Sequence, residues 1–468
     1  CRQAQSASVC AFHTPPQSPS SPPPRPQPTK RVNNMFRQCR LTALALALCL
    51  PLSALGARLR QAPAKQQRPY RQTLHNYQNV QYFADFDIGG QQIAGIFDTG
   101  SFELLVRSTR CAHCVHPTPA YNHEKSNSYA KNGTMTKHVF GSGPCISMMG
   151  YETVKVGPNL VSADQVFWEI VDHRIQVLDT ARFAAIVGIG PNFAYGNKEK
   201  TLLMSYGVTE FSVCLGKPSN SKGYLTWGPS ENEHMKRSDF VTANVIGKHH
   251  WVTPLHNVTF SNFKGEQAAI PCSDEAGCAA IIDSGTSLIA APGYALMQLS
   301  EMIPPIKEDC SNLHELPTLT FMIDGKPFQL PPQAYVMRVT GATLEANDIW
   351  DILFFKPKIR KLDMCMPAFM QIDMASKHGP IWIMGMPFLR YYHTTFDRTN
   401  KLMHFAVAGQ DCFPTPYQIN GTRREIMLET GKHGADLGPM DIEVDKLVPP
   451  RLSGMMDFPF KNKGEIEF

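Results

Sequence analysis

One short pattern occurs twice in this sequence and constrains the fold more than any other feature. An apolar run ends in aspartate, and a hydroxyl residue, a glycine and a second hydroxyl residue follow, at 96–101 (Ile-Phe-Asp-Thr-Gly-Ser) and at 281–286 (Ile-Ile-Asp-Ser-Gly-Thr). Aspartate is depleted in strands and costly to bury alone. A single copy is compatible with an ordinary turn at the end of a strand. Two copies, with Asp98 and Asp283 185 residues apart, indicate two related halves.

Each copy is followed by a second repeated feature, two apolar residues and a glycine. These are 186–188 (Ile-Val-Gly) and 383–385 (Ile-Met-Gly). If each half forms one lobe and the lobes face each other across a cleft, Asp98 and Asp283 come together. Two neighbouring carboxyl groups share a proton and titrate as a pair. One then acts as a base toward water and the other as an acid toward a carbonyl group, so the repeat predicts hydrolytic chemistry.

The length and the apolar pattern predict a mainly β protein of two lobes with extensions. The chain has 468 residues, which is too long for one small domain. Alternation around a Gly-Gly pair at 80–100 predicts two strands joined by a turn, and 136–157 predicts a hairpin with a Gly-rich tip followed by a further strand. A helical pattern is limited to short segments such as 293–303.

The N-terminal region differs in charge from the rest of the chain. Residues 1–75 contain 11 Lys or Arg and no Asp or Glu, so the remainder is acidic although the whole chain has a net charge of +5. An acidic body argues against nucleic-acid binding. Residues 1–34 are a low-complexity leader, which we interpret as upstream translation. Residues 35–57 have the basic start, apolar run and small residues of a secretory signal peptide, with a signal anchor as the alternative.

Two further segments flank the predicted lobes. Residues 58–76 are basic and poor in apolar residues, which fits either a solvated tail or a short prosegment lying on the acidic body. Residues 413–468 mix charge, Pro and Gly without periodicity, so we expect a disordered tail or a docking segment. No later apolar run reaches membrane length, so we expect no membrane span in the mature protein. The predicted localisation is the secretory pathway, with the protein either secreted or held in an acidic, lysosome-like compartment.

Secretion makes the cysteines candidates for disulfide bonds. The chain has 13 Cys, of which nine follow the predicted signal peptide. The stretch Cys-Ala-His-Cys-Val-His at 111–116 has the ligand types of a zinc site, but no second ligand pair has zinc-finger spacing, so a small disulfide loop is the better interpretation. Because nine is odd, one thiol is free, and Cys214, within an apolar strand, is the natural candidate.

The two Asp motifs, the apolar-apolar-Gly runs and the residues at 391–408 together resemble those of pepsin-like aspartic proteases. The resemblance extends from about Tyr77 to Val407. It implies a mainly β, bilobal fold with a cleft between an N-terminal lobe at 77–240 and a C-terminal lobe at 241–412. It also implies an aspartic endopeptidase that hydrolyses polypeptide substrates without a cofactor or a metal ion. We expect the protein to be a monomer.

The resemblance assigns roles to individual residues. The catalytic pair that holds the attacking water would be Asp98 and Asp283. Support would come from Ser101 and Thr286, which bind the outer carboxylate oxygens, and from Thr99 and Ser284, which join the two loops. The positions that contact substrate would be Gly100, Gly285, Phe140, Gly141 and Ser142. The implied disulfides are Cys111–Cys114, Cys272–Cys278 and Cys310–Cys365.

The predicted hairpin at 136–157 departs from the family pattern. The family's flap carries a tyrosine before its glycine where this chain has Phe140, and Leu105 replaces the tryptophan which that tyrosine contacts. Losing both partners leaves no buried donor without an acceptor. The pair therefore predicts an altered flap and a cleft that prefers large apolar residues beside the scissile bond. Cys145 has no counterpart in the family pattern.

The altered flap leaves a second function open. A catalytically inactive pepsin-like protein would keep the cleft and bind peptides without cleaving them. The completeness of both Asp motifs favours the endopeptidase. A zinc hydrolase built on residues 111–116 would lose its activity in the presence of chelators.

Overall fold

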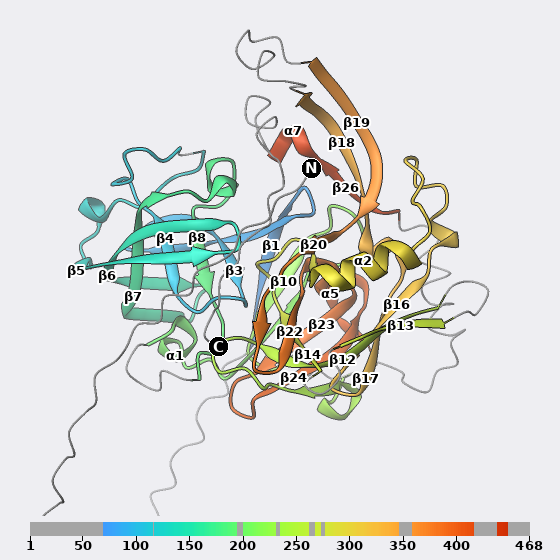
Figure 1. Cartoon of the computed structure of the whole chain (residues 1–468). Coiled ribbons are helices and arrows are strands. Elements are labelled where there is room, and N and C mark those ends of the chain that lie inside the picture. Colours follow the sequence, from blue (N-terminus) through green and yellow to red (C-terminus); the bar gives the residue numbers. More distant parts are fainter. Residues whose placement is uncertain are drawn as a thin grey trace, which may run out of the picture. The chain divides into compact units, whose positions relative to one another are not determined.

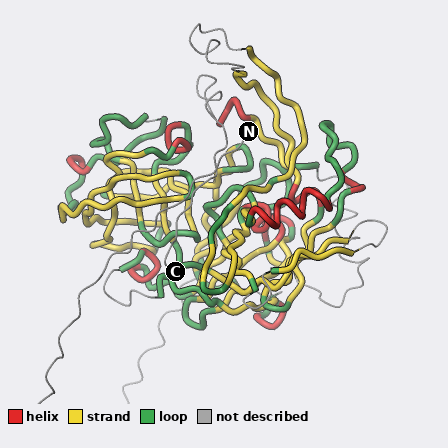
Figure 2. The backbone as a smooth tube through the Cα atoms, viewed as in Figure 1, coloured by secondary structure: helices red, strands yellow, loops and turns green. Residues whose placement is uncertain are grey.

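The computed structural model describes residues 69–115, 117–193, 200–230, 235–261, 267–272, 277–345, 358–415 and 438–447. All of these residues belong to one compact unit, 65–468. Strands account for most of the described chain, as expected from the sequence, and helices are short (Figure 2). The predicted leader at 1–34 and signal peptide at 35–57 lie outside the described residues.

The largest sheet draws strands from both halves of the chain (Figure 1). Its order is β11-β24-β23-β9-β10-β1-β2-β3-β8-β4-β7-β6-β5, with β25 paired to β24. The bounds are β1 Tyr70–Tyr77, β2 Gln81–Ile88, β3 Gln91–Asp98, β4 Leu104–Arg107, β5 Ala130–Phe140, β6 Gly143–Val156, β7 Leu160–His173, β8 Ala185–Gly188, β9 Glu210–Cys214, β10 Gly223–Trp227, β11 Val241–Asn244, β23 Tyr392–Asp397, β24 Leu402–Ala408 and β25 Pro414–Thr415. Because β1 begins at Tyr70, the end of the segment expected to precede the lobes, 58–76, is already part of this sheet.

The second sheet is formed by the C-terminal half. Its order is β17-β16-β12-β14-β22-β15-β20, with β13 beside β12 and β21 beside β22. The bounds are β12 Val252–Ser261, β13 Gln267–Pro271, β14 Cys278–Ile282, β15 Ile289–Ala291, β16 Thr318–Ile323, β17 Lys326–Leu330, β20 Phe369–Gln371, β21 Ala375–Ser376 and β22 Gly379–Met384.

Helices are minor elements of this fold. The α-helices are α1 Leu202–Ser205, α2 Gly293–Met302, α3 Pro332–Tyr335, α5 Met386–Tyr391 and α7 Val444–Leu447. Turns of 3₁₀ helix lie at η1 His123–Lys125, η2 Gln176–Asp179, η3 Arg237–Asp239, η4 Leu313–Glu315 and η5 Gln410–Cys412. Helix α2 coincides with the helical pattern at 293–303. Within the described ranges, no helix has the length and apolar character needed to cross a membrane.

The strand topology repeats between the two halves. In the first half, β3 lies parallel to β8, and β4 lies antiparallel to β8 and parallel to β7. In the second half, β14 lies parallel to β22, and β15 lies antiparallel to β22 and parallel to β20. The two aspartate motifs therefore lie at the ends of equivalent central strands, β3 in the first half and β14 in the second. The chain has the two-lobed β architecture that the sequence repeat predicted.

The predicted strand pair at 80–100 shows how the local sequence builds this arrangement. Strands β2 and β3 pair antiparallel, and Ile88 lies opposite Gln91 across a two-residue turn. Gly89 and Gly90 form this turn with φ values of 59° and 78°. Turns of this kind need positive φ at both central residues, which glycine adopts without a steric penalty. The turn thus directs β3 back into the core, where it ends at Asp98.

Aromatic side chains join the two halves beneath the central strands. Phe211 of β9 and Phe396 of β23 stack with ring centres 4.9 Å apart, and Trp251 lies 5.0 Å from Phe396. The Trp251 indole N–H donates to the backbone oxygen of Ile189 over 3.1 Å. Buried aromatic pairs in such geometries add about 0.5–1.5 kcal/mol each beyond the area they bury. The halves are therefore fixed to each other close to the aspartate loops.

A third, three-stranded sheet brings the C-terminal segment back onto the fold. It consists of β18 Val336–Glu345, β19 Lys358–Pro367 and β26 Met440–Glu443, with β26 parallel to β18 (Figure 1). Met440 and Ile442 are buried against Met337 and Val339. The expectation of disorder over 413–468 is therefore wrong for β25, β26 and α7. The pairing of β26 with the distant strand β18 gives no signal in the local composition, whereas β25 pairs with the neighbouring strand β24.

Side chains near the end of β1 hold the C-terminal segment in place. Asn79 Nδ2 donates to the Asp441 backbone oxygen over 2.6 Å, and Gln78 Oε1 accepts from the Glu443 N–H over 2.8 Å. Tyr77 donates its hydroxyl to the Lys446 backbone oxygen over 2.7 Å. The first two bonds satisfy backbone groups of β26, whose other edge pairs with β18, and the third binds α7.

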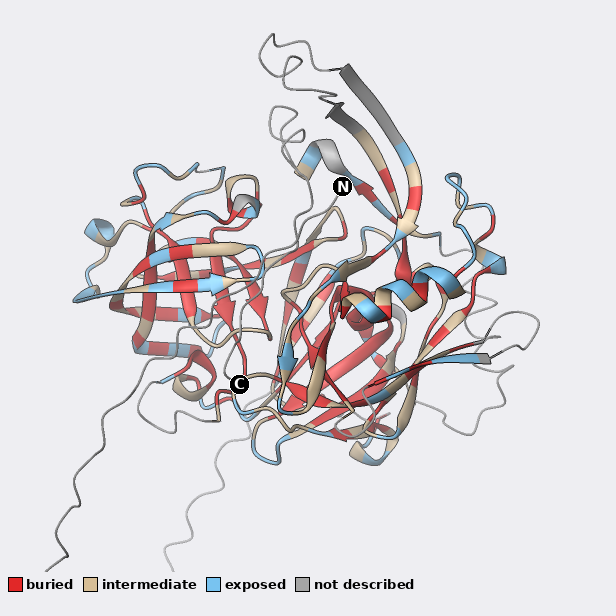
Figure 3. Cartoon of the chain, in the orientation of Figure 1, coloured by how far each residue is buried: buried red, intermediate tan, exposed pale blue. Residues whose placement is uncertain are grey.

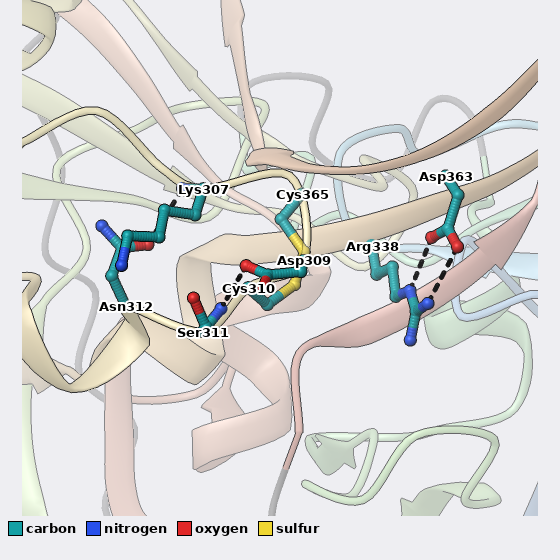
Figure 4. The surroundings of a disulfide bond; sticks show 8 residues. All are labelled: Lys307, Asp309, Cys310, Ser311, Asn312, Arg338, Asp363 and Cys365. Carbon is teal, nitrogen blue, oxygen red and sulfur yellow. Dashed lines mark hydrogen bonds and ion pairs between the residues drawn. A yellow bond between two sulfur atoms is a disulfide. The ribbon is translucent and has the colours of Figure 1, made fainter.

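A disulfide and an ion pair fix the base of the β18–β19 hairpin (Figure 4). Cys365 of β19 is bonded to Cys310, and the Cys365 N–H donates to the Glu308 backbone oxygen over 2.9 Å. Across the hairpin, the Arg338 guanidinium binds both carboxylate oxygens of Asp363, at 2.8 and 3.0 Å. Exposed pairs of this kind contribute little to stability, so the disulfide is the main constraint here.

The structure corrects one prediction about the cysteines. It contains the three pairings implied by the resemblance, Cys111–Cys114, Cys272–Cys278 and Cys310–Cys365. The prediction that Cys214 is the free thiol is wrong, because Cys214 is bonded to Cys412. Among the described cysteines the free one is Cys145, which is buried in β6. An apolar neighbourhood suits a buried disulfide as well as a thiol, so the sequence around Cys214 could not decide between them.

Candidate active site

Asp98 and Asp283 occupy equivalent places in the two halves. Asp98 is the last residue of β3 and lies beside Gly188 of the parallel strand β8. Asp283 directly follows β14, whose last residue, Ile282, lies beside Met384 of the parallel strand β22. The buried strands carry both carboxyl groups into the interior, where Asp98 and Asp283 are 8% and 7% exposed. Burial at this depth requires partners for the carboxyl oxygens.

Each loop supplies the same two hydrogen bonds to its own aspartate. The glycine two residues on donates its N–H to one carboxyl oxygen, and the hydroxyl residue three residues on donates its O–H to the other. The donors are Gly100 at 2.8 Å and Ser101 at 2.6 Å for Asp98, and Gly285 at 2.7 Å and Thr286 at 2.6 Å for Asp283. These bonds fix the plane of each carboxyl group.

Thr99 and Ser284 link the two loops reciprocally. Ser284 Oγ accepts from the Thr99 N–H over 3.1 Å, and Thr99 Oγ1 accepts from the Ser284 N–H over 2.9 Å. Each hydroxyl also donates to the opposite strand, Thr99 to the Ile282 oxygen at 2.9 Å and Ser284 to the Phe97 oxygen at 2.6 Å. The structure thus brings together the pair that the resemblance assigned to joining the loops. The four bonds set the separation of the two aspartates.

The glycine of each motif lies against the aspartate of the other. A Cβ atom on Gly100 would lie 2.7 Å from Cγ of Asp283, and a Cβ atom on Gly285 would lie 2.7 Å from Cγ of Asp98. Both distances are shorter than any non-bonded contact of a real Cβ. Glycine is therefore required at these positions so that the two carboxyl groups can approach each other.

The close approach changes the acidity of the pair. Burial raises the pKa of Asp98 well above the usual carboxyl value, and the negative charge of Asp283 and the hydrogen bond to its carboxyl group raise it further. The bonds from Ser101 and Gly100 act in the opposite direction but do not outweigh these causes. Asp98 therefore retains a proton at a pH where an exposed aspartate has lost it.

The sequence was compared with known protein families and proteins. The profile of the family described as "Eukaryotic aspartyl protease" matches residues 81–408, which include both aspartate loops. The chain belongs to this family of proteases. It is 29% identical over 362 residues to cathepsin D of Gallus gallus, covering 72% of this chain and 83% of the relative. It is 30% identical over 373 residues to cathepsin E-B of Xenopus laevis (74% and 83% covered), and 28% identical over 355 residues to pepsin A of Bos taurus (72% and 86% covered).

The protease carries a histidine beside the aspartate pair that the sequence analysis missed. His250 Nδ1 lies 2.8 Å from the backbone oxygen of Gly100. Burial lowers the pKa of His250, although the bond to Gly100 and the charge of Asp283 act to raise it. The signal in the sequence was the His249-His250 pair directly before the buried Trp251, at the start of an apolar strand.

The predicted flap residues of the protease lie at the tip of one hairpin. Phe140 ends β5 opposite Gly143 at the start of β6, so Gly141 and Ser142 form a two-residue turn. Phe140 is half-buried and packs against the main core. Leu105 is fully buried in β4, so its contribution to the site is packing rather than substrate contact.

In the protease, the two cysteines of residues 111–116 are not available as thiolate ligands for zinc. Cys111 and Cys114 are bonded to each other, and His113 is exposed beside them. In the part of the chain that the structure describes, no three His, Cys, Asp or Glu side chains gather as ligands of a metal ion would.

Gly285→Ala is expected to lower kcat of the protease at least about 100-fold, because the added methyl group displaces the Asp98 carboxyl group and misaligned reacting groups lose rate at this scale. Steady-state kinetics on a peptide substrate measure the effect. Gly438→Ala is the matched control, since no atom lies within 4 Å of a Cβ at Gly438. A Gly285→Ala protein with normal kcat would contradict the role assigned to the close approach.

Proposed function

We propose that this protease is an endopeptidase in which Asp98 and Asp283 activate a water molecule for attack on a peptide bond. The observation that supports the proposal is the pair of facing carboxyl groups, each held by two donors of its own loop and each bordered by the other motif's glycine. Rigid placement of catalytic groups is a main source of rate enhancement in enzymes.

The proposed reaction needs one ionised and one protonated carboxyl group. Asp98, with its raised pKa, holds the proton. The mechanism assigns the role of base to the other carboxyl group, that of Asp283. Asp283 takes a proton from water as the oxygen attacks the carbonyl carbon, and Asp98 donates its proton to the carbonyl oxygen. The tetrahedral intermediate then collapses: Asp283 gives the proton taken from water to the amine nitrogen, and the C–N bond breaks. A hydroxyl group of the intermediate returns its proton to Asp98 as the carboxylic acid product forms, so both groups regain their starting states. Ser101 and Thr286 keep the carboxyl groups oriented throughout.

We expect the activity to be highest on the acidic side and to fall as the pH rises. The active form carries one proton, and because the pKa of Asp98 is raised, this form persists above the range of an ordinary carboxyl group. The rate decreases as Asp98 loses its proton. A profile of kcat/KM between pH 2 and pH 9 measures this dependence, and a rate still rising above pH 8 would contradict the shared-proton mechanism.

Substrates of the proposed endopeptidase bind as extended chains under the β5–β6 hairpin. The Gly141-Ser142 turn presents backbone groups to the backbone of a peptide, which gives affinity without sequence selection. The phenyl ring of Phe140 makes the adjoining surface apolar, so we propose a preference for large apolar residues beside the cut. Such pockets discriminate by about 1–3 kcal/mol per methylene-scale difference, so a peptide-library profile should show a broad preference.

The four disulfides of the described chain support a protein of the secretory pathway, either secreted or in an acidic, lysosome-like compartment. Disulfides persist in oxidising compartments and are rare in the cytosol. An acidic compartment also matches the expected pH dependence. Immunofluorescence of the tagged protein with organelle markers tests this localisation.

The deciding experiment is cleavage of a denatured protein by the purified protein at acidic pH, with fragments identified by mass spectrometry. We expect internal cuts. The alternative function, peptide binding without turnover, rests on the altered flap alone. It would be supported if peptides bind with measurable affinity while no cleavage occurs at any pH between 2 and 9.

A further inference from the structure

One buried histidine attaches the outer strand of the flap hairpin to the body of the protein. We use "flap hairpin" for β5 and β6, residues 130–156. Strand β5 lies at the end of the large sheet, and most of its residues are exposed (Figure 3). Thr136, His138 and Phe140 alternate toward the interior, and His138 is the one residue of β5 that is buried. Besides its pairing with β6, β5 is therefore held on the body of the protein mainly by the buried His138 and the half-buried Phe140.

His138 contacts three different elements. Its Nε2 atom lies 2.9 Å from Oε2 of Glu103, an ion-pair distance without hydrogen-bond alignment. Its Nδ1 atom lies 2.7 Å from Oγ of Ser147 in β6. Its ring meets the ring of Trp168 in β7 edge to face, with centres 4.9 Å apart. Cys145 lies opposite His138 in the hairpin, and burial raises the pKa of its thiol to about 12, so the thiol adds no negative charge beside His138 at neutral pH.

Glu103 belongs to the loop that holds Asp98. The loop continues from Asp98 through Ser101, and the Glu103 backbone oxygen accepts from the Gly188 N–H over 2.9 Å. A side chain at Gly188 would overlap the Glu103 backbone, so the loop is packed directly on β8. The Glu103 backbone is thus fixed relative to the aspartate pair. Its side chain contacts His138 and so links the aspartate loop to β5.

Trp168 lies next to one of the two positions at which the flap departs from the family pattern. Trp168 lies directly opposite Leu105 in the parallel pairing of β7 with β4. The family pattern has a tyrosine and a tryptophan at positions 140 and 105. Here the contact between flap and body joins His138, two residues before Phe140 on β5, to Trp168, which lies on the strand beside Leu105. Edge-to-face pairs of this kind are favourable because the positive ring edge meets the negative ring face.

We infer that His138 is a positioning residue, which sets the height of the Gly141-Ser142 turn over the aspartate pair through Glu103 and Trp168. The inference rests on the proposed function and names the residue that prepares this site for substrate. When His138 is present, the flap hairpin is ordered before a peptide binds, so less conformational entropy is lost on binding. The aspartate pair is untouched by His138, so its loss should weaken binding more than the chemical step.

The test compares His138→Gln with Lys137→Gln, which removes a charge from the adjacent, exposed position. We expect His138→Gln to raise KM about tenfold and to leave kcat within about threefold of the wild-type value. A rise in KM without a matching fall in kcat indicates a loss of ground-state binding. Lys137→Gln should leave both constants unchanged. A merely structural role would lower the active fraction, and hence apparent kcat, at constant KM.

A double-mutant cycle with Glu103→Gln shows whether the two side chains act as one unit. We expect the single changes to be strongly non-additive in kcat/KM, because either one removes the same contact. His138→Phe keeps the ring beside Trp168 and should recover part of the loss in His138→Gln. Additive effects, or no effect of His138→Gln on KM, would overturn the inference.

Hydrogen–deuterium exchange separates this inference from the proposed function. Amides of the flap hairpin at 136–147 should exchange at least about tenfold faster in His138→Gln than in the wild type and in Lys137→Gln, since fewer contacts oppose local opening. This readout does not need catalysis. Unchanged exchange would overturn the inference even in an active enzyme, whereas faster exchange in an inert protein would uphold the attachment and overturn the endopeptidase.

Discussion

Asp98→Asn and Asp283→Asn are each expected to lower kcat by about 10³- to 10⁴-fold, because an amide neither accepts the proton of water nor donates one to the carbonyl oxygen. The two carboxyl groups act as one unit, so the double variant should be scarcely less active than either single variant. Peptide cleavage at the pH optimum measures the effect. KM should change far less than kcat. Full activity in either single variant would exclude the two-carboxyl mechanism.

The pH dependence of stability shows whether an inactive Asp98→Asn protein is correctly folded. The pKa of Asp98 is higher in the folded than in the unfolded chain, so the folded state binds more protons and loses stability as pH rises through this window. Asparagine does not ionise. We therefore expect Asp98→Asn to melt at a higher temperature than the wild type at neutral pH, and the difference to vanish below the unfolded carboxyl pKa of about 3.9.

Removal of the Cys214–Cys412 disulfide in the double variant Cys214→Ala/Cys412→Ala is expected to cost about 5 kcal/mol of unfolding free energy. The bond links residues 198 apart, and closure of so long a loop removes much of the entropy of the unfolded chain. It also ties β9 to the residues that follow β24. The midpoint of urea unfolding measures the loss.

The control removes the Cys111–Cys114 bond in the same way. This bond spans a separation of 3 residues, and the same relation predicts a loss of about 2 kcal/mol. Equal losses in the two double variants would contradict the loop-entropy account and point to local packing around the sulfur atoms.

The aspartate loops were predictable because residues adjacent in the sequence determine their geometry. Each motif carries its own donors at fixed offsets, Gly100 and Ser101 for Asp98, so a short pattern contains most of the site's hydrogen bonds. The repetition of the motif then indicated that two such loops meet. The apolar run at 186–188 marked the strand packed beside Asp98.

Other features depend on contacts that no short pattern contains. The bond between Cys214 and Cys412 requires β9 and the end of β24 to be neighbours in space. His138, Glu103 and Trp168 belong to three separate elements, and none of them stands out in the sequence. The ordering of β26 depends on the free edge of β18. In each case, long-range packing overrides the local preference on which sequence patterns rest.

The parallel pairing of β26 with β18 has a consequence for synthesis on the ribosome. Translation delivers β18 about a hundred residues before β26, so the backbone groups at this edge have no strand to pair with while the intervening chain is made. Met337 and Val339 lack the cover that Met440 and Ile442 supply until these two residues are made. A chain truncated before Met440 would keep both aspartate loops but leave the edge of β18 unpaired, and we expect such a chain to aggregate more readily than the full chain.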